Sequence, residues 1–131
     1  MELRTDLDLD PAQVGAVRHT LMRYVIDQGV PADRDLLMLL ASELVTNAIR
    51  YGEPPLELVV RTDDHHLRLE VHDCNEAPPI IQPPGEVAVG GHGLQLVNAL
   101  ADRWGWAPGI SGGKLVWFEL DLPTSATAQA R

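Results

Sequence analysis

The chain has 131 residues, which fits one domain of ordinary size, and its apolar fraction of 45% is enough for a core without disulfides or structural metals. A single cysteine excludes an internal disulfide, and no signal peptide or membrane-spanning apolar run is evident, so we expect a cytoplasmic protein. A net charge of −9 argues against DNA or RNA as a partner, whereas a small anion held by backbone N–H groups stays compatible.

The first elements predicted along the chain are a short edge strand over residues 3–9 and a helix over 11–28. Asp10 followed by Pro11 is typical of a helix start, with an N-cap carboxylate before proline at the first helical position. Gly29 marks the end of this helix. Apolar residues recur at helical spacing between these signals, at Val14, Val17, Leu21 and Val25.

A second helix is expected from Pro31 to Tyr51, with Gly52 as its stop. Its wide apolar face predicts a central position in the fold, and the face includes Leu36, Leu37, Leu40, Leu44, Val45 and Ala48. Two alternating segments joined by a tight turn at residues 63–65 then predict an antiparallel hairpin. The alternation continues to Asp73, so this carboxylate is expected on the same face as Leu67, Leu69 and Val71.

Residues 74–92 are rich in proline and glycine, so no regular element is expected there. A third helix should begin near Gly93, and a final hairpin follows around residues 108–113. We expect one domain over residues 1–122 and a flexible tail over 123–131. The order of elements predicts an α+β protein, a two-layer α/β sandwich with a mixed, mostly antiparallel sheet and its helices on one face.

Three segments of the sequence combine polar or glycine residues with neighbouring apolar positions and are candidate binding residues. Glu43 and Asn47 are four residues apart on the second helix and so share a face; the alternative is a solvated rim position with a mutual hydrogen bond. Asp73 ends a strand on its buried side, where it could accept hydrogen bonds from a ligand amine or cap the N–H groups of the following loop. The third piece is the run Gly90-Gly91-His92-Gly93 before Leu94, which suits an anion at a helix start but also suits a simple hinge.

Together these pieces resemble the GHKL superfamily of ATPases, whose domain has the Bergerat fold. The matching segments are "LLASELVTNAIRYG", "LEVHDCNEAPP", "GGHGLQLVNALADRWGW" and "GGKLVWFELDLP", and they extend over nearly the whole chain. Within the superfamily the chain is similar to the anti-sigma-factor serine/threonine kinases and related small regulatory ATP-binding proteins of actinobacteria.

The resemblance implies a role for each polar residue. Glu43 matches the general base, Asn47 the Mg²⁺ ligand, and Asp73 the carboxylate that accepts a hydrogen bond from the adenine amine. The second glycine box beside the ATP phosphates is matched by Gly91, His92, Gly93 and Leu94. Residues 76–92 match the ATP lid.

The chain also departs from the superfamily pattern. Where the first box has D-x-G-x-G, Asp73 is followed by Cys74-Asn75-Glu76-Ala77, and both glycines are missing. Asn75 is expected to keep the turn because asparagine tolerates a left-handed backbone, and Cys74 is expected to line the pocket floor. His92 stands where this branch commonly has arginine, which lowers the attraction for phosphate when the imidazole is neutral.

The function implied by the resemblance is an ATP- and Mg²⁺-dependent kinase that phosphorylates an anti-anti-sigma (STAS-type) protein and regulates transcription by partner switching. A sigma factor is a further expected partner, and the family suggests a homodimer. The alternative is a non-catalytic module that sequesters a sigma factor or another regulator, with ATP structural or absent.

Overall fold

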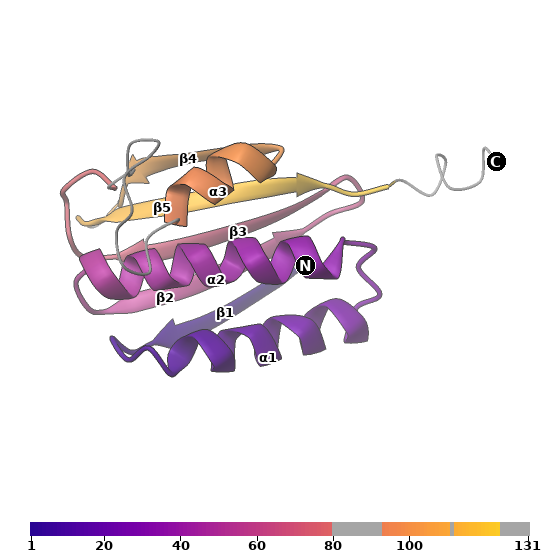
Figure 1. The fold of residues 1–131 in the computed structure, drawn as a ribbon, viewed down its shortest axis with the longest axis horizontal. Coiled ribbons are helices and arrows are strands. Elements are labelled where there is room, and N and C mark those ends of the chain that lie inside the picture. Colours follow the sequence, from indigo (N-terminus) through magenta and orange to yellow (C-terminus); the bar gives the residue numbers. More distant parts are fainter. Residues whose placement is uncertain (80–92, 111, 124–131) are drawn as a thin grey trace.

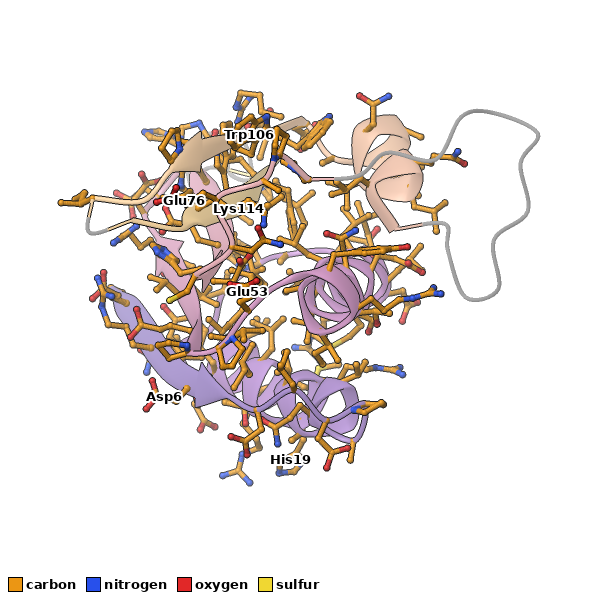
Figure 2. The ribbon with its side chains drawn as sticks, turned by 90° about the vertical axis from the view of Figure 1, so that its left-hand side faces the viewer. Asp6, His19, Glu53, Glu76, Trp106 and Lys114 are labelled. Atoms are coloured by element: carbon orange, nitrogen blue, oxygen red, sulfur yellow. The ribbon has the colours of Figure 1, made fainter. Side chains whose placement is uncertain are left out.

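The structure is a computed structural model that describes residues 1–79, 93–110 and 112–123. Its elements are β1 (Glu2–Leu7), α1 (Gln13–Asp27), α2 (Arg34–Tyr51), β2 (Leu56–Thr62), β3 (His66–Asp73), α3 (Gly93–Leu100), β4 (Arg103–Pro108) and β5 (Lys114–Asp121). The strands form one sheet in the order β1-β2-β3-β5-β4, and every pair in it is antiparallel. All three helices cover one face of this sheet, as Figures 1 and 2 show, which confirms the predicted two-layer α+β sandwich.

The first helix begins two residues later than predicted, at Gln13 rather than at residue 11. The carboxylate of Asp10 accepts a hydrogen bond from the N–H of Ala12 at 2.9 Å, and its carbonyl accepts one from Gln13, so Pro11 belongs to a turn before the helix. Gly29, with φ of 64°, reverses the chain after the helix as expected. His19 points from α1 away from the sheet (Figure 2).

The second helix begins at Arg34 and not at Pro31, because Asp33 is extended and forms the N-cap. Its carboxylate accepts a hydrogen bond from the N–H of Leu36 at 3.1 Å and so satisfies one of the free donors of the first turn. The helix then runs to Tyr51, as predicted, and lies between α1 and α3 over the sheet (Figure 1). It has more buried residues than α1, among them Leu37, Leu40 and Leu44.

The core fills the space between the helices and the inner face of the sheet. Apolar side chains at alternate strand positions meet the apolar faces of α1 and α2, as their periodicities predict. The largest fully buried side chains include Leu21, Leu37, Leu40, Leu44, Leu58, Leu67, Leu69, Leu94 and Phe118. The same alternation carries a few polar residues to the inner face at the ends of β3 and β5.

The outer face of the sheet carries a lattice of ion pairs centred on Glu70. This residue is 4% exposed, and its carboxylate contacts Arg61 at 2.8 Å, Arg68 at 2.7 Å and His72 at 2.9 Å. Burial by itself raises the pKa of Glu70, but the hydrogen bonds with His72 and Arg68 and the charge of Arg61 outweigh it, so the pKa lies below its usual value. Arg68 also stacks 4.1 Å from the ring centre of Trp117, which completes this polar surface.

Two expectations fall on residues that the structure does not describe. Most of the expected lid, residues 80–92, and nearly all of the expected tail, residues 124–131, lie outside the described ranges. Within the described ranges, no helix has both the length and the apolar character that crossing a bilayer requires.

Candidate functional site

Asn47 lies on the inner side of α2, where the helix packs toward the ends of β3 and β5. It is 9% exposed and lines a cavity between the helix and the sheet, so its position differs from the solvated rim considered as the alternative. Glu43 lies one turn earlier on the same helix and is half-buried, but it is not part of the cavity lining. The helical spacing thus places both side chains on one side of α2, with Asn47 at the cavity and Glu43 next to it.

Asp73 is the last residue of β3 and points inward, as the alternation predicts. It is 6% exposed, and its Oδ1 accepts a hydrogen bond from the N–H of Asn75 at 2.6 Å. Gly52, just after α2, packs directly on it: a Cβ at position 52 would lie 3.0 Å from Cγ of Asp73. The absence of a side chain there lets the end of α2 approach the carboxylate and brings Tyr51 and Asp73 to the same cavity.

Asn75 keeps the turn after Asp73, but not in the way expected from the sequence. Among the described residues, only glycines have positive φ, so the left-handed backbone expected at Asn75 is wrong. Its side chain holds the turn instead: Nδ2 donates to the carbonyl of Tyr51 at 2.9 Å, and Oδ1 accepts from the N–H of Ala77 at 2.9 Å. Asparagine thus links the turn to the end of α2 by hydrogen bonds that glycine could not make.

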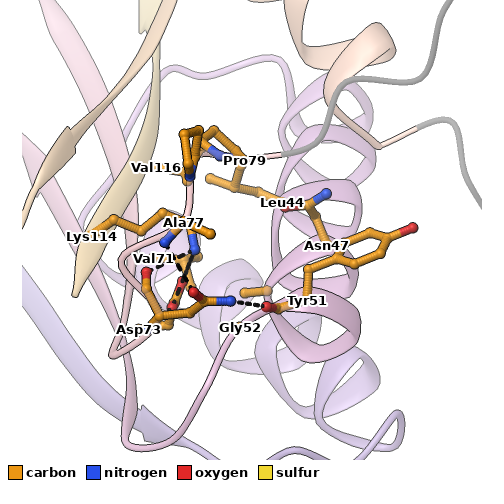
Figure 3. A pocket seen from close by; sticks show the side chains of 13 residues that line it. Leu44, Asn47, Tyr51, Gly52, Val71, Asp73, Ala77, Pro79, Lys114 and Val116 are labelled. Atoms are coloured by element: carbon orange, nitrogen blue, oxygen red, sulfur yellow. Dashed lines mark hydrogen bonds and ion pairs between the residues drawn. The ribbon is translucent and has the colours of Figure 1, made fainter.

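The cavity formed by these residues has a volume of about 240 Å³ and is shown in Figure 3. Its walls are mainly apolar, and three of its polar lining residues, Asp73, Asn75 and Lys114, are joined by hydrogen bonds. Its apolar lining consists of Leu44, Ala48, Val71, Ala77, Pro78, Pro79 and Val116. An apolar slot with a few convergent polar groups suits a flat, partly polar ring.

The glycine-rich segment is only partly described. Gly90, Gly91 and His92 lie outside the described residues, and α3 begins at Gly93. Leu94 is 2% exposed and belongs to the hydrophobic core, so its side chain anchors the start of α3. A ligand at this helix start could meet Leu94 through its backbone.

Lys114, which is not among the site residues expected from the sequence, lines the same cavity. It is 5% exposed, and its Nζ lies 3.2 Å from Oδ2 of Asp73 and donates to the carbonyl of Asn75 at 3.1 Å. Figure 2 shows its side chain between the sheet and α2. A signal for it exists in the sequence, because position 114 is in phase with the buried positions Val116 and Phe118 of β5.

Cys74 differs from its expected place on the pocket floor. Its side chain is exposed and its thiol faces the carbonyl of Pro55 at 3.8 Å. Because successive side chains at a strand end point to opposite faces, the residue after the inward-facing Asp73 points away from the cavity.

A match to a known protein family includes all of the site residues described above. The profile of the family described as histidine kinase-like ATPase domain matches residues 7–119. The fold resembles the solved RsbU and RsbW domains of Rv1364c from Mycobacterium tuberculosis, with a TM-score of 0.69 and 20% sequence identity. That match covers 93% of this chain and 32% of the solved chain, so this chain spans about a third of the length of the one it matches. No curated protein sequence matches the chain.

Proposed function

The chain belongs to the family of histidine kinase-like ATPase domains, and from this membership we propose that it binds ATP with Mg²⁺ and acts as an anti-sigma-type protein serine/threonine kinase. The observation that carries the proposal is the meeting of Asn47 and Asp73 at one cavity. They come from different elements, 26 positions apart in the sequence, and the resemblance assigns them to opposite ends of one nucleotide.

The base of ATP would occupy the apolar part of the cavity beside Asp73, with the phosphates directed toward Asn47. A buried amide oxygen suits Mg²⁺, which keeps several waters and takes its other ligands from phosphates. When bound, this ion would offset the negative charge of the phosphates. The donor chemistry at Asn47 therefore fits the ion that the family implies.

Glu43 would serve as the general base. The hydroxyl oxygen of a serine on the partner attacks the γ-phosphorus while its proton passes to the Glu43 carboxylate, and the bond to the β-phosphate oxygen breaks to release ADP. In this proposal, its place one turn from Asn47 would set it beside the phosphate end of the site. Gly91, His92 and Gly93 would complete that end with backbone N–H groups.

For the partners, we propose an anti-anti-sigma protein of the STAS type as the phosphorylated substrate and a sigma factor as the sequestered one. The resemblance of the chain to anti-sigma kinases supports this choice, and the solved neighbour holds an RsbW domain beside an RsbU domain. In this proposal, residues 1–122 act as one domain, as a homodimer in the cytoplasm.

One observation favours a second candidate, a binding module without catalysis. The carboxylate of Asp73 already accepts hydrogen bonds from Asn75 and Lys114, so part of its capacity for a ligand amine is taken. A module of this kind would sequester a sigma factor or another regulator, with ATP structural or absent.

The decisive experiment is transfer of labelled γ-phosphate from ATP to a candidate STAS-type protein. We expect transfer by the natural chain and at least a hundredfold loss in Glu43→Gln, in the range of general-base contributions. Asp35→Asn is the matched control, because Asp35 is an exposed carboxylate in the first turn of the same helix. Calorimetric binding of Mg-ATP without transfer to any partner would favour the second candidate, and no binding at millimolar ATP would contradict the proposed nucleotide site.

A further inference from the structure

Lys114 and Asp73 form a buried ion pair at the end of the proposed nucleotide cavity. They are directly opposed in the antiparallel register of β3 and β5, so both side chains leave the sheet on its inner face. Their side chains are 5% and 3% exposed. Few lysines are buried to this degree, and those that are usually have a charged partner.

The backbone around the pair is built for close approach. Gly113 has φ of 70°, and a Cβ there would overlap the carbonyl oxygen of Asp73 and lie 2.8 Å from Cα of Cys74. Only glycine allows β5 to begin this close to the end of β3. Lys114 follows immediately and is therefore held against Asp73 by the course of the strand.

The hydrogen-bonding capacity of the pair is not exhausted by its contacts within the described chain. A carboxylate offers about four acceptor sites, and Asp73 uses two on Oδ1, for Asn75 and Lys114, and one on Oδ2. An ammonium has three N–H groups, and Lys114 gives one to the Asn75 carbonyl and shares another between the two carboxylate oxygens, at 3.3 and 3.2 Å. Among the described residues, these contacts leave one acceptor site on Oδ2 of Asp73 and one N–H group of Lys114 without a partner, and both residues line the cavity.

We propose that Lys114 selects the base, donating to a ring nitrogen while Asp73 accepts from the neighbouring exocyclic amine. This inference rests on the proposed nucleotide site and adds to it a residue that reads the base. Adenine presents this pair of groups, with the 6-amino donor beside the N1 acceptor. A base with a keto group in place of the amine would bring its oxygen, an acceptor, against the Asp73 carboxylate, which is also an acceptor. A base without N1 would leave the buried ammonium of Lys114 without a hydrogen-bond acceptor from the ligand.

The test compares ATP with 1-deaza-ATP, in which a C–H group replaces N1, by calorimetric titration of the full chain with Mg²⁺. The natural chain should bind 1-deaza-ATP about tenfold or more weakly, since it loses a hydrogen bond to a charged donor. Lys114→Met keeps an unbranched apolar side chain without the ammonium. It should bind ATP more weakly than the natural chain does, and should not distinguish the two nucleotides.

Other outcomes of these titrations would contradict either the role of Lys114 or nucleotide binding itself. Equal affinities of the natural chain for both nucleotides would overturn the role of Lys114 and leave nucleotide binding intact. An equal loss for both ligands in Lys114→Met would mean that Lys114 only holds Asp73, and tighter ATP binding would mean that it competes with the base. If neither nucleotide binds the folded natural chain, the proposed function fails together with this inference.

Thermal unfolding of each variant shows whether it is folded, and the comparison on the natural chain does not depend on any variant. Lys114→Gln adds a second readout because it keeps an uncharged N–H donor on a long side chain. We expect it to retain a smaller preference for ATP over 1-deaza-ATP, since hydrogen bonds from neutral donors are about half as strong as those from charged ones.

Discussion

Replacement of Gly113 by alanine tests the close approach of β5 to β3 on which the arrangement of the cavity depends. The new Cβ would meet backbone atoms of Asp73 and Cys74, which cannot move aside by changing a rotamer. The left-handed backbone costs a non-glycine residue about 1–2 kcal/mol, and overpacking adds about 1–3 kcal/mol. We therefore expect the free energy of unfolding to fall by roughly 2–5 kcal/mol.

Two other glycines separate these contributions. Gly29 has φ of 64°, and a Cβ at this position would have no neighbouring atom within 4 Å, so Gly29→Ala should show the backbone cost alone, about 1–2 kcal/mol. Gly15 lies inside α1 with open space around it, so Gly15→Ala should stabilise the protein by about 0.5–1 kcal/mol.

Urea unfolding, followed by tryptophan fluorescence and circular dichroism, measures all three variants on one scale. Two of the tryptophans, Trp104 and Trp106, lie on β4 and a third, Trp117, lies on β5, so fluorescence reports on the affected part of the sheet. An unfolding free energy of Gly113→Ala equal to that of Gly29→Ala would refute the steric argument, and with it the constrained approach of Lys114 to Asp73.

Three further changes have defined expected outcomes. Asp73→Asn should lower the unfolding free energy by about 3–5 kcal/mol in denaturant titration, because it leaves the ammonium of Lys114 buried without its counter-charge; an unchanged midpoint would contradict the ion pair. The pKa of Glu70 is lower in the folded chain, so its stabilising contribution is complete above the pKa of the unfolded chain and is lost as pH falls through the pKa of the folded chain. Glu70→Gln should therefore weaken the dependence of stability on pH in acid, measured by denaturation between pH 7 and 3, and an unchanged slope would count against this. Asp33→Ala removes the N-cap of α2 and should lower the free energy of unfolding by about 1 kcal/mol in the same denaturant titration. A decrease smaller than the experimental error would contradict this capping role.

Much of the fold follows from local pattern in the sequence. Apolar spacing of 3.6 and 2 residues defines the helices and strands, and glycine and proline define most of their ends. Both of the first two helices begin after the proline that suggests their start. The carboxylate of Asp10 holds a turn before α1 by accepting from Ala12, and the carboxylate of Asp33 caps α2 by accepting from Leu36. Side-chain capping depends on local geometry, which residue type alone does not specify.

The candidate site is determined by the sequence in its residue types and by the tertiary structure in its arrangement. Helical spacing places Glu43 and Asn47 on one side of α2, and strand alternation turns Asp73 inward, so these could be expected from the sequence. The same alternation turns Lys114 to the inner face, but its partner could not be known without the strand order. The two hairpins are locally self-consistent, and only the non-local pairing of β3 with β5 joins them and sets Lys114 opposite Asp73.

The turn at Asn75 shows the same division. The missing glycines are visible in the sequence, and they raise the question of how the turn is kept. The answer depends on the carbonyl of Tyr51, 24 positions earlier, which lies within reach of the Asn75 amide because α2 packs over the end of β3. Periodicity determines which face of an element a residue occupies, but which residues meet across the core depends on packing between distant segments, and that packing exists only in the folded chain.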